Sequence, residues 1–285
     1  MHKTIALFTI FLILVIGFGY LLNLYFNNPN ILYWAVGLSV VMSVISYWFS
    51  DKLVLAMTRA QPVSRAEMLE LYEVVENLVK KAKLPMPKLY IVQDPAPNAF
   101  ATGRNPKNAV VAVTSGILER LNQEELEGVL AHELSHIKNY DMLVSTAAVI
   151  LAGFVSIASD ILMRSAMFGG FGRRDERGAG GLVALLVLLG AILAPIAALL
   201  LRLAVSRQRE FGADASGARL VGKADGLASA LIKISQYPQA LRSANNTTAH
   251  LWFANPFRGR GVWQLFLTHP PVEKRVAALR SHPYN

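Results

Sequence analysis

The stretch His132-Glu133-Leu134-Ser135-His136 sets the architecture expected of this chain. On a helix, residues four apart lie about 40° from each other around the axis, so His132 and His136 face the same way and can bind one metal ion. Glu133 lies about 100° round from His132, beside the metal, where it can take a proton from the attacking water. This arrangement is typical of a zinc hydrolase, most often a protease.

The residues before this motif predict that it lies on a helix with one buried face. Asn122, followed three residues later by Glu125, fits the capping box that begins a helix. Polar side chains on such a helix are costly in a core unless they have a partner. This favours metal binding over the alternative, two solvated histidines on a surface helix. The apolar residues that recur at helical spacing are Leu126, Val129, Leu130 and Leu134.

A catalytic zinc site needs a third protein ligand and leaves its fourth position to water. The best candidate lies in residues 206–214, where Glu210 and Asp214 are again four residues apart. We predict that Glu210 binds the metal and that Asp214 orients a ligand imidazole through its free N–H. Without the histidine motif, the same two acids would be interpreted as ordinary charges on an exposed helix.

The composition is that of a membrane protein, with 53% hydrophobic and only 16% charged residues. Residues 4–26 carry no charge and are long enough to cross a bilayer, and residues 31–50 form a second predicted span after a polar turn. Residues 142–163 and 182–205 are a further pair of spanning length. A shallow re-entrant hairpin is the alternative for that later pair.

Positively charged residues near the ends of the spans predict which side of the membrane the rest of the chain faces. Lys3 precedes the first span, and Lys52 and Arg59 follow the second, which places the region after residue 50 on the cytoplasmic side. The net charge of +9 comes without a recognisable nucleic-acid-binding motif, so we expect a lipid bilayer, not nucleic acid, as its partner. The chain has no cysteine, which excludes disulfides and thiolate metal ligands. Four arginines lie between the two segments of the later pair and would be on the outer side if that pair crossed the membrane, which argues against a full crossing. They are Arg164, Arg173, Arg174 and Arg177.

The remaining segments predict an α+β catalytic domain that the later hairpin interrupts. It is mostly helical and zincin-like, with a small sheet. Residues 98–102 are either an edge strand or a loop; an edge strand beside the metal would pair with an extended peptide. Predicted helices are 65–83, 224–237 and 271–281, and predicted strands are 88–92 and 109–114. The expected division is 1–50 as a first transmembrane hairpin, 51–141 and 206–285 as the catalytic domain, and 142–205 as a second hairpin.

Five features in this order resemble the HtpX-type membrane zinc metalloproteases, relatives of the CaaX prenyl endopeptidases. They are the N-terminal hairpin, HELSHIKNYD at 132–141, the later hydrophobic pair, SRQREFGAD at 206–214, and THPPVEKR at 268–275. The resemblance covers essentially the whole chain. It implies a multi-pass endopeptidase of the bacterial inner membrane with its catalytic domain in the cytoplasm. Such an enzyme acts on unfolded or membrane proteins in quality control and stress response.

The resemblance also implies residue roles. One zinc ion per chain is held by His132, His136 and Glu210, with Glu133 as the catalytic base. His269 stabilises the developing oxyanion, although the pattern alone favours a structural loop residue. Asp141 and Arg207 are proposed to brace the site through charge contacts. The substrate-facing strand comprises Asn98, Ala99, Phe100 and Ala101.

Two other classes of protein remain as alternatives. One is a non-proteolytic membrane adaptor with a structural zinc, which a fourth protein ligand would support. The other is an intramembrane protease, which the polar residues around the histidine motif disfavour. The CaaX branch would need many further spans.

Overall fold

The computed structural model describes residues 2–26, 28–169, 192–193, 207–245, 248–256 and 270–281. The chain divides into two compact units. One contains residues 47–146 and 205–285, and the other contains residues 2–46 and 147–204. The histidine motif and Glu210 both belong to the first of these, which we call the catalytic unit.

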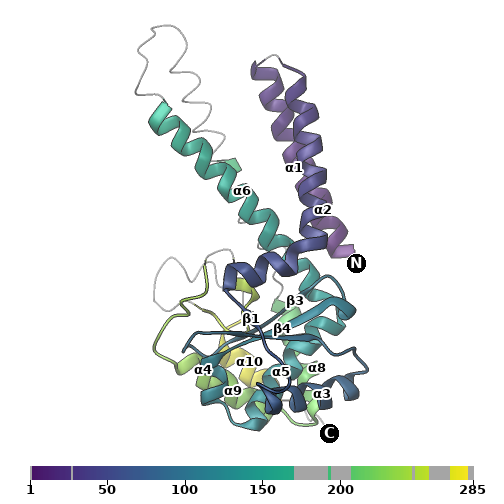
Figure 1. The fold of residues 1–285 in the computed structure, drawn as a ribbon, viewed down its shortest axis with the longest axis vertical. Helices are drawn as coiled ribbons and strands as arrows, with labels where there is room; N and C mark the ends of the chain where they lie inside the picture. The colour runs from purple at the N-terminus through teal and green to yellow at the C-terminus, as the bar shows by residue number, and fades with distance from the viewer. Residues whose placement is uncertain are drawn as a thin grey trace. The chain divides into compact units, whose positions relative to one another are not determined.

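Long apolar helices make up the second unit (Figure 1). They are α1 (His2–Phe26), the larger part of α2 (Asn30–Thr58) and most of α6 (Asp141–Gly169). The helices α1 and α2 pack closely, since a Cβ added at Gly19 would lie 2.3 Å from the Cβ of Ala35.

Among the described residues, α2 is the one helix that is by itself long and apolar enough to cross a membrane. The strongly apolar stretch of α1, Ile5–Tyr20, is shorter. The predicted span 182–205 lies outside the described residues except for 192–193. The two-hairpin topology therefore stays a prediction.

A four-stranded mixed sheet forms one layer of the catalytic unit, with strand order β1-β2-β4-β3. The strands β2 and β4 are parallel, and the other two pairs are antiparallel. Both strands predicted from the sequence are found, and residues 98–102, left open above, largely form the edge strand β3. The bounds are β1 (Gln61–Pro62), β2 (Lys88–Val92), β3 (Ala99–Gly103) and β4 (Ala109–Thr114).

Helices cover one face of this sheet, and the last turns of α2, in dark blue, lie on its other side (Figure 1). The helix predicted from residue 65 begins later because residues 64–67 form a turn, in which the Glu67 carboxylate accepts hydrogen bonds from the N–H and the hydroxyl of Ser64. The helices are α3 (Leu69–Ala82), α4 (Ser115–Arg120), α5 (Gln123–Lys138), α8 (Arg207–Val221), α9 (Asp225–Gln236) and α10 (Val272–Arg280). Short 3-10 turns are η1 (Pro106–Asn108) and η2 (Ala249–Leu251).

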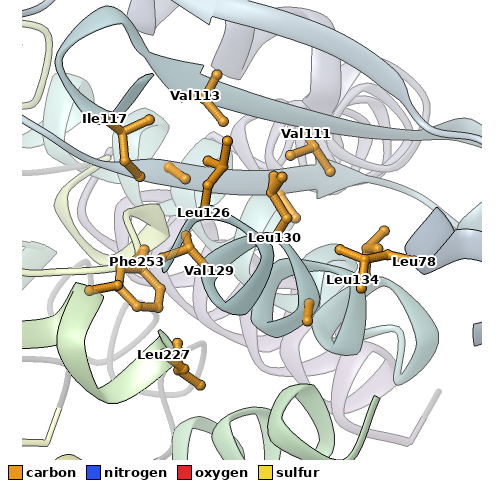
Figure 2. Packing of buried hydrophobic residues seen from close by; sticks show 14 of the residues in the cluster. Leu78, Val111, Val113, Ile117, Leu126, Val129, Leu130, Leu134, Leu227 and Phe253 are labelled. Atoms are coloured by element: carbon orange, nitrogen blue, oxygen red, sulfur yellow. The ribbon is translucent and has the colours of Figure 1, made fainter. Parts of the chain in front are cut away.

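The core of the catalytic unit surrounds α5. In Figure 2, Leu126 and Leu130 of this helix point toward the strand that carries Val111 and Val113. Leu227 of α9 lies on the opposite side of the helix. The motif helix is therefore held between the sheet and other helices, which fixes the direction in which its polar residues point.

Candidate metal centre

The capping box predicted for α5 fixes where this helix begins. The Asn122 side chain accepts a hydrogen bond from the Glu125 N–H, and the Glu125 carboxylate accepts one from the Asn122 N–H, each at 2.9 Å. The Glu125 carboxylate also accepts hydrogen bonds from Ser229 and Lys233 of α9. This partly buried junction sets the position of α5, and with it the position of the histidines two to three turns further along.

Three donor atoms converge where α5 meets α8. The Nε2 atoms of His132 and His136 lie 3.2 Å apart, and the Glu210 carboxylate oxygens lie 3.4 Å from His136 Nε2 and 3.9 Å from His132 Nε2. A tetrahedral zinc ion with bonds of about 2.0–2.1 Å would separate its donor atoms by about 3.3 Å. The predicted ligand set therefore has the chemistry and spacing that zinc requires. Among the described residues, these three are the group of His, Asp and Glu side chains arranged to hold a metal.

Asp214 fixes the orientation of the first imidazole. Its Oδ1 lies 2.9 Å from Nδ1 of His132, so the Nδ1–H donates to the carboxylate and Nε2 points toward the other donors. Burial lowers the pKa of His132 to about 4, which keeps the ring neutral, as a metal ligand must be. Burial tends to raise the pKa of Asp214, but the charge and hydrogen bonds of Arg275 outweigh it and lower that pKa to about 2.

Asp141 supports the second imidazole. It lies just beyond the end of α5, and its Oδ2 is 3.4 Å from His136 Nδ1, while its Oδ1 is 3.6 Å from Nη1 of Arg209. Burial acts to lower the pKa of His136, yet the carboxylates of Asp141 and Glu210 raise it to about 10. Arg207, proposed from the sequence to brace the site, is the first residue of α8 and is exposed. Within the described part of the chain it has no ion pair, and Arg209 contacts Asp141.

Glu133 lies beside the three donors but is not one of them. Its side chain is buried, and the backbone N–H of Ala101 in β3 faces its carboxylate. Burial raises the pKa of Glu133 to about 7, although the positive charge of His136 opposes this shift. A carboxyl group with a pKa near neutrality can both accept and return a proton.

The side chains of the proposed substrate-facing strand are committed to internal contacts. Asn98 donates from Nδ2 to the Ala254 carbonyl at 2.9 Å and accepts from the N–H groups of Ala99 and Ala254. The Ala99 carbonyl accepts from the N–H of Phe253 at 2.8 Å. Phe100 is fully buried. This strand can therefore offer backbone groups, not side chains, to a peptide.

Arg275 was not predicted as a site residue, yet it is central to this cluster. Its side chain is only 1% exposed and binds both oxygens of Asp214, at 2.8 and 2.6 Å. Its Nη1 lies 3.1 Å from the Phe253 carbonyl and 3.7 Å from Oε2 of Glu210. One sequence signal was present: Arg275 shares the core-facing side of α10 with Val276 and Leu279. A charge at such a position requires a buried partner. His269 lies outside the described residues.

Comparisons with known proteins identify the family of this chain. Residues 65–282 match the model of "Peptidase family M48". The chain is 51% identical over 248 residues to a "Protease HtpX homolog" of Syntrophobacter fumaroxidans, covering 86% of this chain and 87% of the relative. It is 48% identical to a "Protease HtpX homolog" of Pyrococcus abyssi, covering 94% and 90%.

A solved structure shares the fold. The crystal structure of S. mikatae Ste24p matches with a TM-score of 0.52 at 19% identity, covering 94% of this chain and 62% of that one. At this identity the match supports the mostly helical fold with a small sheet, and it carries no residue roles. The family match and the HtpX relatives extend over most of the chain, and the ligand geometry agrees with them. The chain therefore belongs to peptidase family M48 and is an HtpX-type metalloendopeptidase.

Proposed function

We propose that this protein is a zinc-dependent endopeptidase of the bacterial inner membrane that hydrolyses peptide bonds of misfolded proteins or of membrane proteins at the cytoplasmic face, as part of protein quality control. The observation that carries the proposal is the position of Glu133, a buried carboxyl group with a pKa near 7 that adjoins three convergent metal-binding atoms. The cytoplasmic orientation rests on the basic residues that follow the first pair of predicted spans.

Zinc, when bound by His132, His136 and Glu210, would polarise the scissile carbonyl and lower the pKa of the attacking water. The Glu133 carboxylate takes a proton from that water and returns it to the leaving amine. The Ala101 N–H faces this carboxylate and favours its charged form. On the proposal drawn from the family resemblance, His269 stabilises the developing oxyanion.

The outer edge of β3 is the proposed binding place for an extended substrate. In an antiparallel pair, alternate residues point their backbone groups outward, and here these are Ala99, Ala101 and Gly103. Phe253 already donates to the Ala99 carbonyl, and the Ala101 N–H faces the Glu133 carboxylate. The Ala101 carbonyl and the Gly103 N–H remain for a peptide that adds as a further strand.

The deciding experiment compares the purified full-length protein with Glu133→Gln, following zinc content and cleavage of casein. The variant should bind about one zinc and lose about a thousandfold in kcat, because a general base contributes 10²–10⁴. Glu127→Gln is the matched control, since Glu127 lies on the same helix and pairs with Lys81 away from the site. Activity retained by Glu133→Gln would exclude its role as base.

A structural zinc in a non-proteolytic adaptor is the competing function. Structural sites are closed by four protein ligands, whereas the described residues supply three. If wild type and Glu133→Gln both bind zinc and neither cleaves any substrate, the adaptor becomes the better account.

A further inference from the structure

The last three turns of α2 expose large apolar side chains on the catalytic unit. Within residues 47–58, Val54 and Thr58 are buried, which fixes the inner face of these turns. The outer side chains are Trp48, Phe49, Leu53 and Met57, exposed by 52, 48, 37 and 38%. We call these four residues together with Lys52 the α2 face. Large apolar side chains that gather on the exposed side of a helix are typical of an interaction site.

Positive charge accompanies this apolar surface. The Arg104 guanidinium lies 4.2 Å above the ring of Trp48, and Lys52 Nζ lies 5.5 Å from the ring of Phe49. In the described ranges of the chain, no carboxylate forms an ion pair with either cation. The acid in these three turns is Asp51, so Arg104 and Lys52 outweigh it by one charge. Lys107 and Arg59 are also exposed and add two more.

The position of Arg104 suits it to bind a phosphate. A guanidinium over an indole ring is held there by the ring, and its N–H groups can still donate to another partner. Guanidinium N–H groups match the oxygens of a phosphate in a two-pronged hydrogen bond. Aromatic and aliphatic side chains beside such a group are the combination found on protein surfaces that lie in the interface of an anionic bilayer.

We propose that the α2 face and Arg104 dock on the surface of an anionic phospholipid bilayer, with Arg104 and Lys52 supplying the charge that recognises headgroup phosphates. Charge complementarity supports this occupant over a protein partner. The same occupant is supported because these turns are the end of α2, the described helix that is long and apolar enough to cross a membrane.

This docking reaches the catalytic base through one strand. Arg104 directly follows Gly103, the last residue of β3, and β3 also carries Ala101, whose N–H faces Glu133. A phosphate on Arg104 restrains the end of this strand. The charge of the bilayer thus regulates the outer edge of β3, which is proposed to receive substrate. This effect is separate from the chemistry of cleavage.

The test measures hydrogen–deuterium exchange of residues 103–108 in the full-length protein in lipid nanodiscs. The nanodiscs contain phosphatidylcholine alone or with about one-third phosphatidylglycerol, enough to give an anionic surface. We expect exchange to slow about fivefold in the anionic discs, the factor that one basic residue near such a surface contributes to binding. Hydrogen–deuterium exchange can be measured without any cleavage of substrate. We therefore expect the same difference between the two discs in Glu133→Gln, and this result does not depend on whether the protein is a protease.

Substitutions on two separate elements isolate the surface. Arg104→Gln and Lys52→Gln should each abolish most of the difference between the two discs, and Arg104→Lys should keep only part of it because lysine lacks the planar fork. Arg280→Gln is the matched control, an exposed arginine on α10, one of the helices on the other side of the sheet from the last turns of α2 (Figure 1). Unchanged exchange in α5 shows that each variant is folded.

Three outcomes overturn the proposal. One is equal exchange of residues 103–108 in neutral and anionic discs. Another is that both single variants, Arg104→Gln and Lys52→Gln, keep the full slowing of exchange in the anionic discs. The third is the same protection from inorganic phosphate added to neutral discs, which would assign the site to a soluble anion and not to the membrane.

Discussion

Arg275 holds both carboxylate oxygens of Asp214, and the same carboxylate accepts the N–H of His132. A guanidinium on α10 thus orients a metal ligand on α5 through an acid on α8. Because all three side chains are almost fully buried, none of them can exchange its partner for water.

Arg275→Met should therefore weaken zinc binding about 10–100-fold, the usual effect of removing a residue that supports a metal ligand. It should also lower the free energy of unfolding by about 3 kcal/mol, since Asp214 becomes a buried charge without a partner. Zinc titration and chemical denaturation measure the two effects. Adding Asp214→Asn to the Arg275→Met variant should recover part of the stability and none of the zinc affinity. Normal zinc affinity in Arg275→Met would show that Asp214 orients His132 unaided.

Zinc binding should release about one proton near pH 7.5, and that proton should come from His136. Its pKa of about 10 keeps this ring charged in the metal-free protein, whereas the pKa of His132, about 4, leaves that ring already neutral. A metal ligand must give up its proton, so apparent affinity should rise about tenfold per pH unit up to the pKa of His136. Calorimetry in buffers of different ionisation enthalpy counts the protons. Asp141→Asn, which removes a group that raises this pKa, should reduce the pH dependence. No proton release would contradict the charged state.

The parts of the site that the sequence predicts are those that short-range patterns specify. The helical spacing of His132 and His136, the cap at Asn122 and the spacing of Glu210 and Asp214 each lie within a few residues of chain. Arg275 lies 61 residues from Asp214. Its role depends on how α10 docks, which no local pattern records, and its one signal was a charge on an apolar helix face.

The strand at the edge of the sheet shows the same limit. Residues 98–102 fit a strand or a loop equally well because their sequence does not alternate between apolar and polar side chains. Their conformation is decided by β4 on one side and by the bonds of Asn98 and Ala99 to residues 253–254 on the other. Both partners are distant in sequence.

Asn98→Ala tests whether this residue binds substrate or holds the strand. Its side chain makes three hydrogen bonds within the protein and is 3% exposed. We expect the free energy of unfolding to fall by about 2 kcal/mol, because buried partners lose their hydrogen bonds. Thermal unfolding of zinc-loaded protein measures this, and steady-state kinetics follow in parallel. An unchanged melting temperature with a raised KM would instead support direct contact with substrate.

Gly217 and Gly212 on α8 provide a matched pair for testing how helix packing sets the metal site. A Cβ at Gly217 would lie 2.9 Å from the backbone nitrogen of His132, whereas one at Gly212 meets nothing within 4 Å. Gly217→Ala should push α8 away from α5 and so move Glu210 away from His132. Overpacking of this kind costs about 1–3 kcal/mol of stability, and zinc affinity should fall with it.

Gly212→Ala should leave zinc affinity unchanged and stabilise the protein by up to about 1 kcal/mol, since alanine favours the helix over glycine. Zinc titration and denaturation of both variants separate backbone packing from helix propensity. Loss of zinc in both would mean that α8 must flex to bind the metal. Loss in neither would mean that the two helices can separate without disturbing Glu210, and the close contact at Gly217 would then have no part in forming the site.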